Sequence, residues 1–561
     1  MKEADTTRQF SIESEQTAGS DKFFNSFNAI GGKSGNWIYY AYFDQRNGDG
    51  WRDNAAFNYQ AYYSNLTYQF NQKGSLSFQF SRMNYRQQIA GGLTDEQFNQ
   101  DSRQSTRFRN YFRPIINIPA LIFNYDLSKS TKLQISAHSL FGERSSVQFI
   151  AAPNVADTIN LTLNSYNPRQ VDRDYYNGFT TEARILQQYR IGNLTSILSG
   201  GIRYFTELTK RRQKGQGTAG TDFDLSLNGA YGIDLRLHTD NYAIFAENIF
   251  QLSSRFSITP GFRYEIIKTS LKGVINNASV PVNYTGDRNF PLFGTGLQYQ
   301  VSNETQLYGN ISQAYRPYIY ANVTPADRLD VIDPNLKDSK GYDIDLGYRG
   351  HLSPFFRFDV NGFYLYYGNR VGLLTQTGSD GLAHLFTTNI GNAVAKGVEA
   401  YAELSLKNLL FKNTQMVDMK VFNSLSYTHA RYTSGMLNQS GSNKSLAGNR
   451  VEGTPDWINR TGVSFLNKHI STTLQLSYVS KSYSDAGNTI QNAIGSVGIV
   501  PAYSVLDWAF TWSFLKNYHI TANVNNIADA KYFTRRINMY PGPGILPAEG
   551  RTFNVGLGIK L

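Results

Sequence analysis

The C-terminal stretch, residues 503–561, contains three successive segments in which apolar side chains recur at every second residue. The first runs from Leu506 to Phe514, the second covers 520–524 and the third covers 553–561. Period two is the pattern of a β-strand with one apolar and one polar face. The intervening residues are mostly Gly, Asn, Ser and Thr, too small and polar for the outside of a soluble sandwich. The pattern therefore predicts large side chains facing lipid and small ones facing the lumen of a transmembrane β-barrel.

The rest of the chain continues this pattern, which gives about 22 predicted strands in total, joined alternately by short turns and long loops. This alternation is typical of an all-β, antiparallel up-and-down barrel with periplasmic turns and extracellular loops. A lumen of that width is too wide for its own side chains to fill, so a plug is expected inside it. The predicted strands are residues 10–16, 22–31, 36–46, 60–70, 74–87, 115–127, 131–146, 179–190, 193–205, 242–252, 255–268, 292–301, 305–315, 340–350, 355–368, 396–406, 418–431, 457–467, 470–480, 503–514, 519–527 and 551–561.

Composition agrees with a membrane barrel. Aromatic residues make up 14% of the chain, which suits two interfacial girdles, and no stretch is apolar enough for a transmembrane helix. The lack of cysteine excludes a disulfide scaffold and thiolate metal sites. The net charge of +11 is spread along the chain among Asp and Glu, so we expect no nucleic-acid partner. Residues 1–5 are polar and lack the apolar core of a signal peptide, so we expect a mature or trimmed product.

Strand parity assigns several ionisable residues to the polar, inward face. They must pair with one another, meet water, or meet a polar body inside the barrel. We expect them to be solvated in the lumen or to contact a plug. They are Arg263, Glu265, Arg349 and Glu399, with Asp343, Asp345, Arg357, Asp359 and Glu403.

A series of short motifs follows the predicted strands in a fixed order. They are the Gly-rich turn at 47–54, Phe245–Asn248, Pro260–Glu265, Ala314–Pro317, Asn389–Ala393 with Lys396–Glu399, Gly453–Pro455, and Asn525–Asp529 with Tyr532. In order and spacing they resemble the barrel of TonB-dependent outer-membrane receptors, from about residue 8 to the end. Within that superfamily, residues 483–489, 501–503, 532–535 and 543–551 are similar to ferric dicitrate-type transporters.

The chain departs from this family in two ways. Leu561 stands where the family has a terminal aromatic residue. The resemblance also implies a plug domain and a TonB box before the barrel, for which the sequence has no counterpart. We therefore expect residues 1–7 to be a remnant of the plug-to-barrel linker and residues 8–561 to be the receptor barrel.

The resemblance implies energy-coupled uptake of a ferric chelate, either ferric citrate or a siderophore, by a monomeric, multi-pass protein of the Gram-negative outer membrane. Its implied partners are outer-membrane lipid and lipopolysaccharide, the chelate, a plug domain and TonB, with no cofactor. Iron citrate is anionic, and guanidinium groups bind carboxylates through two hydrogen bonds. The candidate ligand-binding residues are Arg316 and Arg328 in one loop, Arg211 with Lys210 and Arg212 in another, and Arg535, Arg536 and Arg551 around the last.

The sequence also bears on other classes of function. The seven histidines never occur in a metal-ligand spacing and no nucleophile elbow is present, so an enzyme is not expected. The stronger alternative is a passive outer-membrane pore, because a wide barrel without a plug would be an open channel. Cobalamin, other metal complexes and glycans also remain open as cargo.

Overall fold

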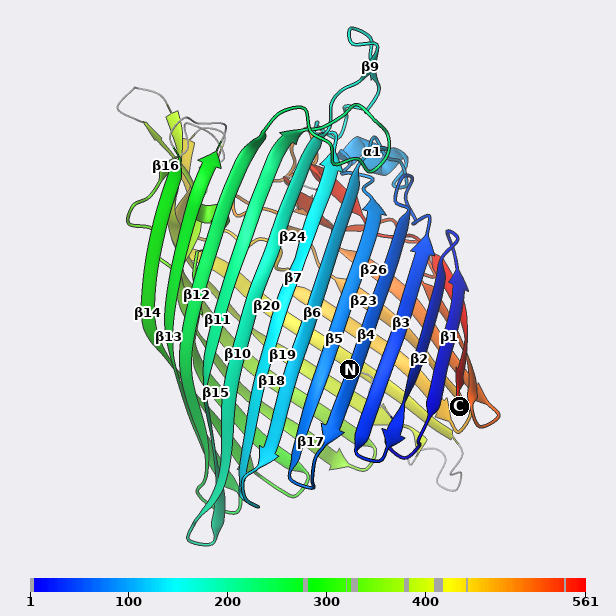
Figure 1. Ribbon diagram of the computed structural model, residues 1–561, viewed down its shortest axis with the longest axis vertical. Helices are drawn as coiled ribbons and strands as arrows, with labels where there is room; N and C mark the ends of the chain where they lie inside the picture. The colour runs from blue at the N-terminus through cyan, green and yellow to red at the C-terminus, as the bar shows by residue number, and fades with distance from the viewer. Residues whose placement is uncertain are drawn as a thin grey trace.

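The computed structural model describes residues 5–275, 281–318, 320–323, 331–377, 383–407, 417–439, 442–538 and 541–561 (Figure 1). Within these residues, 22 antiparallel strands close into one tilted barrel, as the sequence predicted. The barrel strands are β1 (Ser11–Gly19), β2 (Phe24–Ser34), β3 (Trp37–Gly48), β4 (Phe57–Gln69), β5 (Gly74–Gln88), β6 (Tyr111–Asp126), β7 (Thr131–Gln148), β10 (Gln170–Ile191), β11 (Leu194–Gln216), β12 (Tyr231–Gln251), β13 (Phe256–Ile275), β14 (Val282–Gln300), β15 (Thr305–Arg316), β17 (Ser339–Ser353), β18 (Phe356–Thr377), β19 (Ala383–Ser405), β20 (Val417–Gln439), β22 (Trp457–Asn467), β23 (Ile470–Val479), β26 (Tyr503–Phe514), β27 (Tyr518–Asn525) and β30 (Thr552–Lys560).

Short elements lie in the long connections. Helix α1 (Asp95–Gln100) begins with a capping box, in which Thr94 Oγ1 accepts from the Gln97 amide at 3.1 Å and Gln97 Oε1 accepts from the Thr94 amide at 2.9 Å. Among the described residues, none of the helices is long and apolar enough to cross a membrane. The other short elements are β8 (Ile159–Asn160), β9 (Ser165–Tyr166), η1 (Tyr320–Val323), β16 (Val331–Ile332), β21 (Ser442–Ser445), β24 (Ser482–Tyr483), β25 (Ile499–Val500), β28 (Phe533–Ile537) and β29 (Gly544–Pro547).

The first and last strands pair with each other and close the barrel. In the β1–β30 ladder, Glu13 lies opposite Lys560 and Gly19 lies opposite Asn554. Closure leaves the main sheet without a free edge along this seam. A free edge would expose unpaired backbone groups to lipid, where they cannot be hydrogen-bonded. It also makes the first and last loops of the chain neighbours in space.

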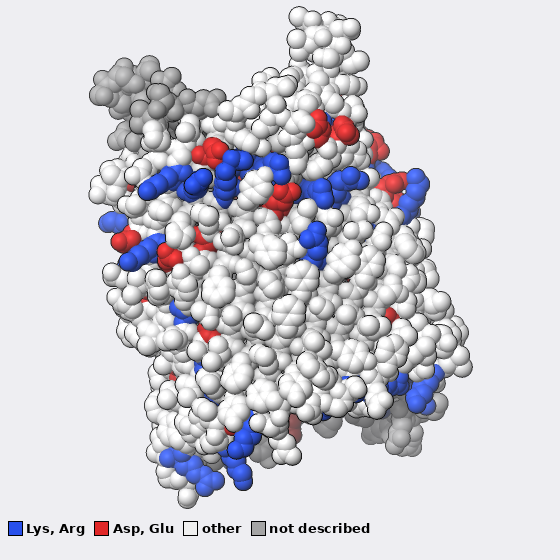
Figure 2. Space-filling view, viewed as in Figure 1, with Lys and Arg blue, Asp and Glu red and all other residues white. Residues whose placement is uncertain are grey.

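The outer and inner faces follow the alternation seen in the sequence. In β30, Phe553 is 59% exposed and Val555 and Leu557 are also exposed, whereas Gly556 and Gly558 are buried. Figure 2 shows a wide zone almost free of charged residues on one face, with Lys, Arg, Asp and Glu gathered above it and basic residues below. The outer surface therefore has the apolar band of a membrane barrel.

Turns and loops separate to opposite ends of the barrel (Figure 1). Tight turns lie at the bottom of the view, and Gly35 and Gly192 allow two of them by adopting φ of 58° and 59°. The long connections lie at the other end, which we call the loop end. The predicted alternation of short and long connections is confirmed.

Several strands extend further toward the loop end than the sequence predicted. β10 begins at Gln170 rather than at 179, and β11 ends at Gln216 rather than at 205. The added part of β11 includes residues 210–214, Lys-Arg-Arg-Gln-Lys, which have no apolar alternation. Backbone ladders to β10 and β12 hold this segment as a strand, so sequence periodicity gave no signal for it.

Candidate functional site at the loop end

Loops that are far apart in the sequence pack together at the loop end. Leu93, Phe98, Val500, Phe533 and Ile545 form a buried apolar cluster drawn from three connections. Leu93 and Ile545 exchange two backbone hydrogen bonds, of 2.9 and 2.8 Å. The first and last large loops are thus joined into one folded layer over part of the barrel mouth.

An ion pair reinforces the same contact. Arg536 donates to both carboxylate oxygens of Asp95, at 2.8 and 2.6 Å, and to the carbonyl oxygens of Ile499 and Gly495. The Arg536 side chain is almost fully buried, 4% exposed. Its cation therefore has a structural role between α1, β25 and β28.

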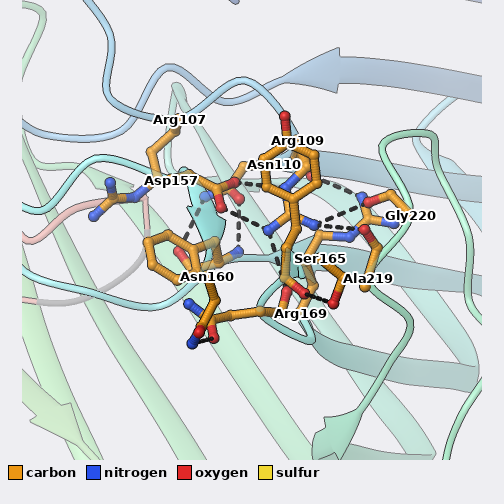
Figure 3. A network of polar contacts seen from close by, with 12 residues as sticks. Arg107, Arg109, Asn110, Asp157, Asn160, Ser165, Arg169, Ala219 and Gly220 are labelled. Carbon is orange, nitrogen blue, oxygen red and sulfur yellow. Dashed lines mark hydrogen bonds and ion pairs between the residues drawn. The ribbon is translucent and has the colours of Figure 1, made fainter. Parts of the chain in front are cut away.

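A second polar network joins the connection between β5 and β6 to two further connections, those between β7 and β10 and between β11 and β12 (Figure 3). Arg109 and Asp157 are fully buried and form a two-point ion pair, with nitrogen–oxygen distances of 2.7 and 2.6 Å. Arg109 also donates to the carbonyl oxygens of Ala219 and Gly220, and Arg169 donates to the carbonyl oxygen of Arg109 at 2.9 Å. We call this the Arg109 network. It fixes residues 217–230 against two preceding loops.

Beside these contacts lies a pocket of about 540 Å³, which we call the mouth pocket. Its walls come from residues 46–59 near the start of the chain, 85–91 in the next loop, and 535–549 near the end. They combine aromatic rings with three guanidinium groups and one carboxylate. The residues that give it this character are Arg46, Trp51, Arg52, Phe57, Tyr59, Tyr85, Arg535 and Glu549.

The mouth pocket carries excess positive charge. Arg46 is neutralised by Asp44 at 2.6 Å, but Arg52 is held by the carbonyl oxygens of Gly91 and Gln104, both at 2.6 Å. Burial lowers the pKa of the Arg52 guanidinium to about 10, which still leaves it charged at neutral pH. Two carbonyl oxygens orient Arg52 by hydrogen bonds, while the carboxylates of Asp53 and Asp101 act on its charge through the field only.

The carboxyl group of Glu549 in the pocket gives up its proton less readily than an exposed glutamate. Burial raises the pKa of Glu549 above its ordinary value, and the nearby carboxylate of Asp21 adds to the shift. A neutral Glu549 would not oppose an anion held by Arg52 and Arg535. The pocket is therefore suited to an anionic ligand with planar or apolar parts that contact its rings.

The structure brings one residue of the C-terminal basic group into the mouth pocket. Arg535 is exposed and lines it, and no ion pair engages Arg535 within the part of the chain that is described. Arg536, its neighbour, points away into the contact with Asp95. Arg551 is exposed outside the pocket lining and donates to the carbonyl oxygen of Ile527 at 3.4 Å.

The other predicted ligand residues lie elsewhere. Arg211 is in the upper part of β11, 3.6 Å from the buried carboxylate of Asp174. Arg316 ends β15 and donates to the hydroxyl of Tyr367 at 3.3 Å. Arg328 falls outside the described residues. Arg211 and Arg316 do not line the mouth pocket.

The four residues predicted to face the lumen alternate with exposed apolar residues of the outer face. Arg263 forms an ion pair with Glu265, whose second oxygen accepts from Asn241 at 2.6 Å. Arg349 and Glu399 line two separate recesses of the wall. They present charge on the face opposite the apolar band.

Sequence reasoning did not single out Arg52, Tyr59, Tyr85 or Glu549. The motif at 47–54 pointed to the right loop, but only as a family signature. Barrel closure was itself predicted, but strand periodicity does not show which side chains of the loops near residues 50 and 540 meet. Because β1 pairs with β30, the loops near residues 50 and 540 lie at neighbouring positions of the barrel mouth and contribute to one site.

No metal cluster accompanies the pocket. Within the residues that the structure describes, no three His, Asp or Glu side chains are grouped so that they could hold a metal ion.

Comparisons with known proteins agree with this architecture. The family model of the TonB dependent receptor-like β-barrel matches residues 4–527. The structure is similar to the unliganded ferric citrate transporter FecA (19% identity, TM-score 0.81), covering 99% of this chain and 79% of that one. It is also similar to the siderophore receptor PiuA from Acinetobacter baumannii (14% identity, TM-score 0.78, covering 100% and 82%). The ferric yersiniabactin uptake receptor FyuA from Yersinia pestis gives 15% identity and a TM-score of 0.73, covering 100% and 81%.

No curated protein matches the chain significantly. The family and the fold are those of receptor and transporter barrels rather than of enzymes. The chain belongs to the TonB-dependent receptor β-barrel family of the outer membrane.

Proposed function

We propose that the protein takes up an anionic ferric chelate across the Gram-negative outer membrane by TonB-dependent transport, and that the mouth pocket binds the chelate. The observation that carries the proposal is the charge of this pocket. Arg52 is oriented in the pocket wall by two carbonyl oxygens, and Arg535 is exposed in the same pocket, so two guanidinium groups would act on the carboxylate oxygens of a bound anion.

Ferric citrate is the favoured cargo. It presents several carboxylates on a compact anion, which matches paired guanidinium groups. The rings of Trp51, Tyr59 and Tyr85 add apolar surface that would also suit a siderophore. FecA, named as a ferric citrate transporter, and PiuA, named as a siderophore receptor, share the fold, so both chelate types are retained as candidates.

Transport through so wide a barrel requires a body that fills the lumen and responds to TonB. Arg263, Glu265, Arg349 and Glu399 supply charges for contact with such a plug. The outer apolar band would contact lipid and lipopolysaccharide around a monomer.

Titration of ferric citrate into the detergent-folded full chain, at fixed salt and pH, tests the pocket. Arg52→Gln and Arg535→Ala should each weaken binding by about tenfold or more, because a hydrogen bond to a charged group contributes about 1.5–3 kcal/mol. Lys444→Ala, an exposed cation of β21 outside the pocket lining, is the matched control and should bind as the unaltered protein does.

Equal affinity in all four proteins would remove the mouth pocket from chelate binding. If the unaltered protein bound a catecholate siderophore or cobalamin in preference to ferric citrate, the cargo assignment would change. Large, steady currents through the native protein in planar bilayers, with no saturable ligand, would favour the passive pore.

A further inference from the structure

The barrel wall is split between β14 and β15 on the loop-end side. β14 pairs with β15 only from Gly294 to Gln300, although the same strand pairs with β13 as far as Val282. Above Gly294, the Phe293 amide donates to the side-chain Oε1 of Gln313 at 3.1 Å. Pro291 lacks an amide hydrogen and cannot contribute a ladder bond there. The two strands therefore part within the wall.

A crevice of about 790 Å³ occupies the split. Its mouth is on the outer face, because Phe293, Ile311 and Tyr342 all belong to the exposed apolar positions of their strands and are 54%, 47% and 38% exposed. Its floor is the stacked pair Phe290 and Tyr315, with ring centroids 3.6 Å apart. The lining is mostly apolar, with Thr295, Gln313 and Lys340 as its polar side chains.

A hydrogen bond to Asp338 fixes the position of Tyr315 in the floor of the crevice. The Tyr315 hydroxyl donates to Asp338, which is also paired with Arg288 at 2.8 Å. Asp338 further accepts from the Tyr318 amide at 2.9 Å. A side chain anchored in this way cannot swing outward to fill the crevice, so the apolar space stays open toward the outside.

One cation stands at the rim. Lys340 lines the crevice and is exposed. It begins the column of outward positions in β17 that continues with Tyr342 and Ile344, so its ammonium group lies on the outer face at the loop-end side of the apolar band. A slot with apolar walls and a cation at its upper end matches a molecule with a hydrocarbon chain below an anionic headgroup.

We propose that this crevice is a binding site for one acyl chain of an anionic outer-leaflet lipid whose phosphate lies against Lys340. The outer face of the barrel meets hydrocarbon in the membrane, so a chain is the molecule that reaches the crevice. Where β14 is paired with both of its neighbours, the wall is closed and offers a lipid chain no space between strands. In the split, a chain is enclosed between two strands and would be retained.

Native mass spectrometry of the full-length protein, released from detergent containing lipid A, tests the proposal. The unaltered protein should retain one lipid A molecule. Thr295→Trp, which adds bulk at an outward position of β14 that lines the crevice, and Lys340→Glu, which reverses the rim charge, should each lower retention about tenfold. Deacylated lipid A should not be retained, because it offers the phosphates without the chain.

Two variants on fully paired parts of the wall serve as controls. Leu297→Trp places the same bulk on an exposed position of β14 that is paired with Gly309, and Arg236→Glu reverses an exposed cation of β12 that is paired on both sides. Both should retain lipid A. Heat-dependent gel mobility confirms that each variant has folded, and Lys340→Glu keeps the test decisive if Thr295→Trp fails to fold. Equal retention in crevice and control variants, or retention of the deacylated probe, would overturn the proposal.

Discussion

The guanidinium group of Arg536 donates hydrogen bonds of 2.8 and 2.6 Å to the two carboxylate oxygens of Asp95. The two residues are 441 positions apart in the sequence. This pair lies beside the apolar cluster of Leu93, Phe98 and Ile545. The contact exists because β1 and β30 are neighbours, which sets the first large loop against the last. A folded layer at the loop end thus depends on closure of the barrel.

Arg536→Ala should loosen this layer without unfolding the barrel. Removing one partner of a largely buried ion pair costs about 3 kcal/mol, since the other charge is left uncompensated. Hydrogen exchange should accelerate in residues 93–101 and 533–537 and stay unchanged in β3 and β4. Arg535→Ala is the adjacent control and should preserve protection in both segments. Unchanged exchange in the Arg536 variant would contradict a structural role for the pair.

Arg109→Lys should release residues 217–230 from the loop end. Lysine keeps the charge but cannot make the two-point contact with Asp157 or reach the carbonyl oxygens of Ala219 and Gly220 together. Limited proteolysis should then cut this segment faster. Arg103→Lys, an exposed arginine paired with Asp21, should leave the cleavage pattern as it was. A pattern identical in both variants would show that the Arg109 network is dispensable.

Binding of an anionic chelate should weaken as pH rises through the raised pKa of Glu549. Below that pKa the carboxyl is neutral, and above it a negative charge appears beside Arg52 and Arg535. The same ionisation costs folding free energy, because a raised pKa means that the folded protein prefers the protonated form, so stability also declines as pH rises in this range.

Glu549→Gln removes both effects. Titrations of the two proteins between about pH 4 and pH 7 should show affinities that converge at the acid end and a tighter Glu549→Gln variant at the neutral end. Comparing the two proteins at each pH cancels changes in the protonation of the chelate itself. Parallel curves over the whole range would refute the role of Glu549.

Gly397→Ala should destabilise the barrel wall. A Cβ at this position would lie 1.9 Å from the carbonyl oxygen of Tyr427 and 2.7 Å from the ring of Phe363. Overpacking against backbone costs about 1–3 kcal/mol, measurable as a lower midpoint of unfolding in urea or guanidinium chloride. Gly362→Ala, in the neighbouring strand with its nearest atoms 3.9 Å away, is the control. If both variants unfolded at the same denaturant concentration as the parent, the close approach at Gly397 would be disproved.

The sequence alone determined that the chain is a wide β-barrel, and it located every barrel strand. Alternation such as Phe553, Val555 and Leu557 against Gly556 and Gly558 is a local signal, because each strand must show one face to lipid and one to the lumen. Where both faces meet water, as at residues 210–214, the alternation vanishes. The upper ends of β10 and β11 were therefore missed.

Only the tertiary structure decided which loops form a site. Arg535 and Arg536 are adjacent and chemically identical in the sequence, yet one lines the mouth pocket and the other is buried against Asp95. Local pattern cannot separate them, because the partner of Arg536 comes from the opposite end of the chain. Strand periodicity is a local property of each strand. The mouth pocket forms where loops from opposite ends of the chain meet, and the split forms where the ladder between β14 and β15 stops at Gly294.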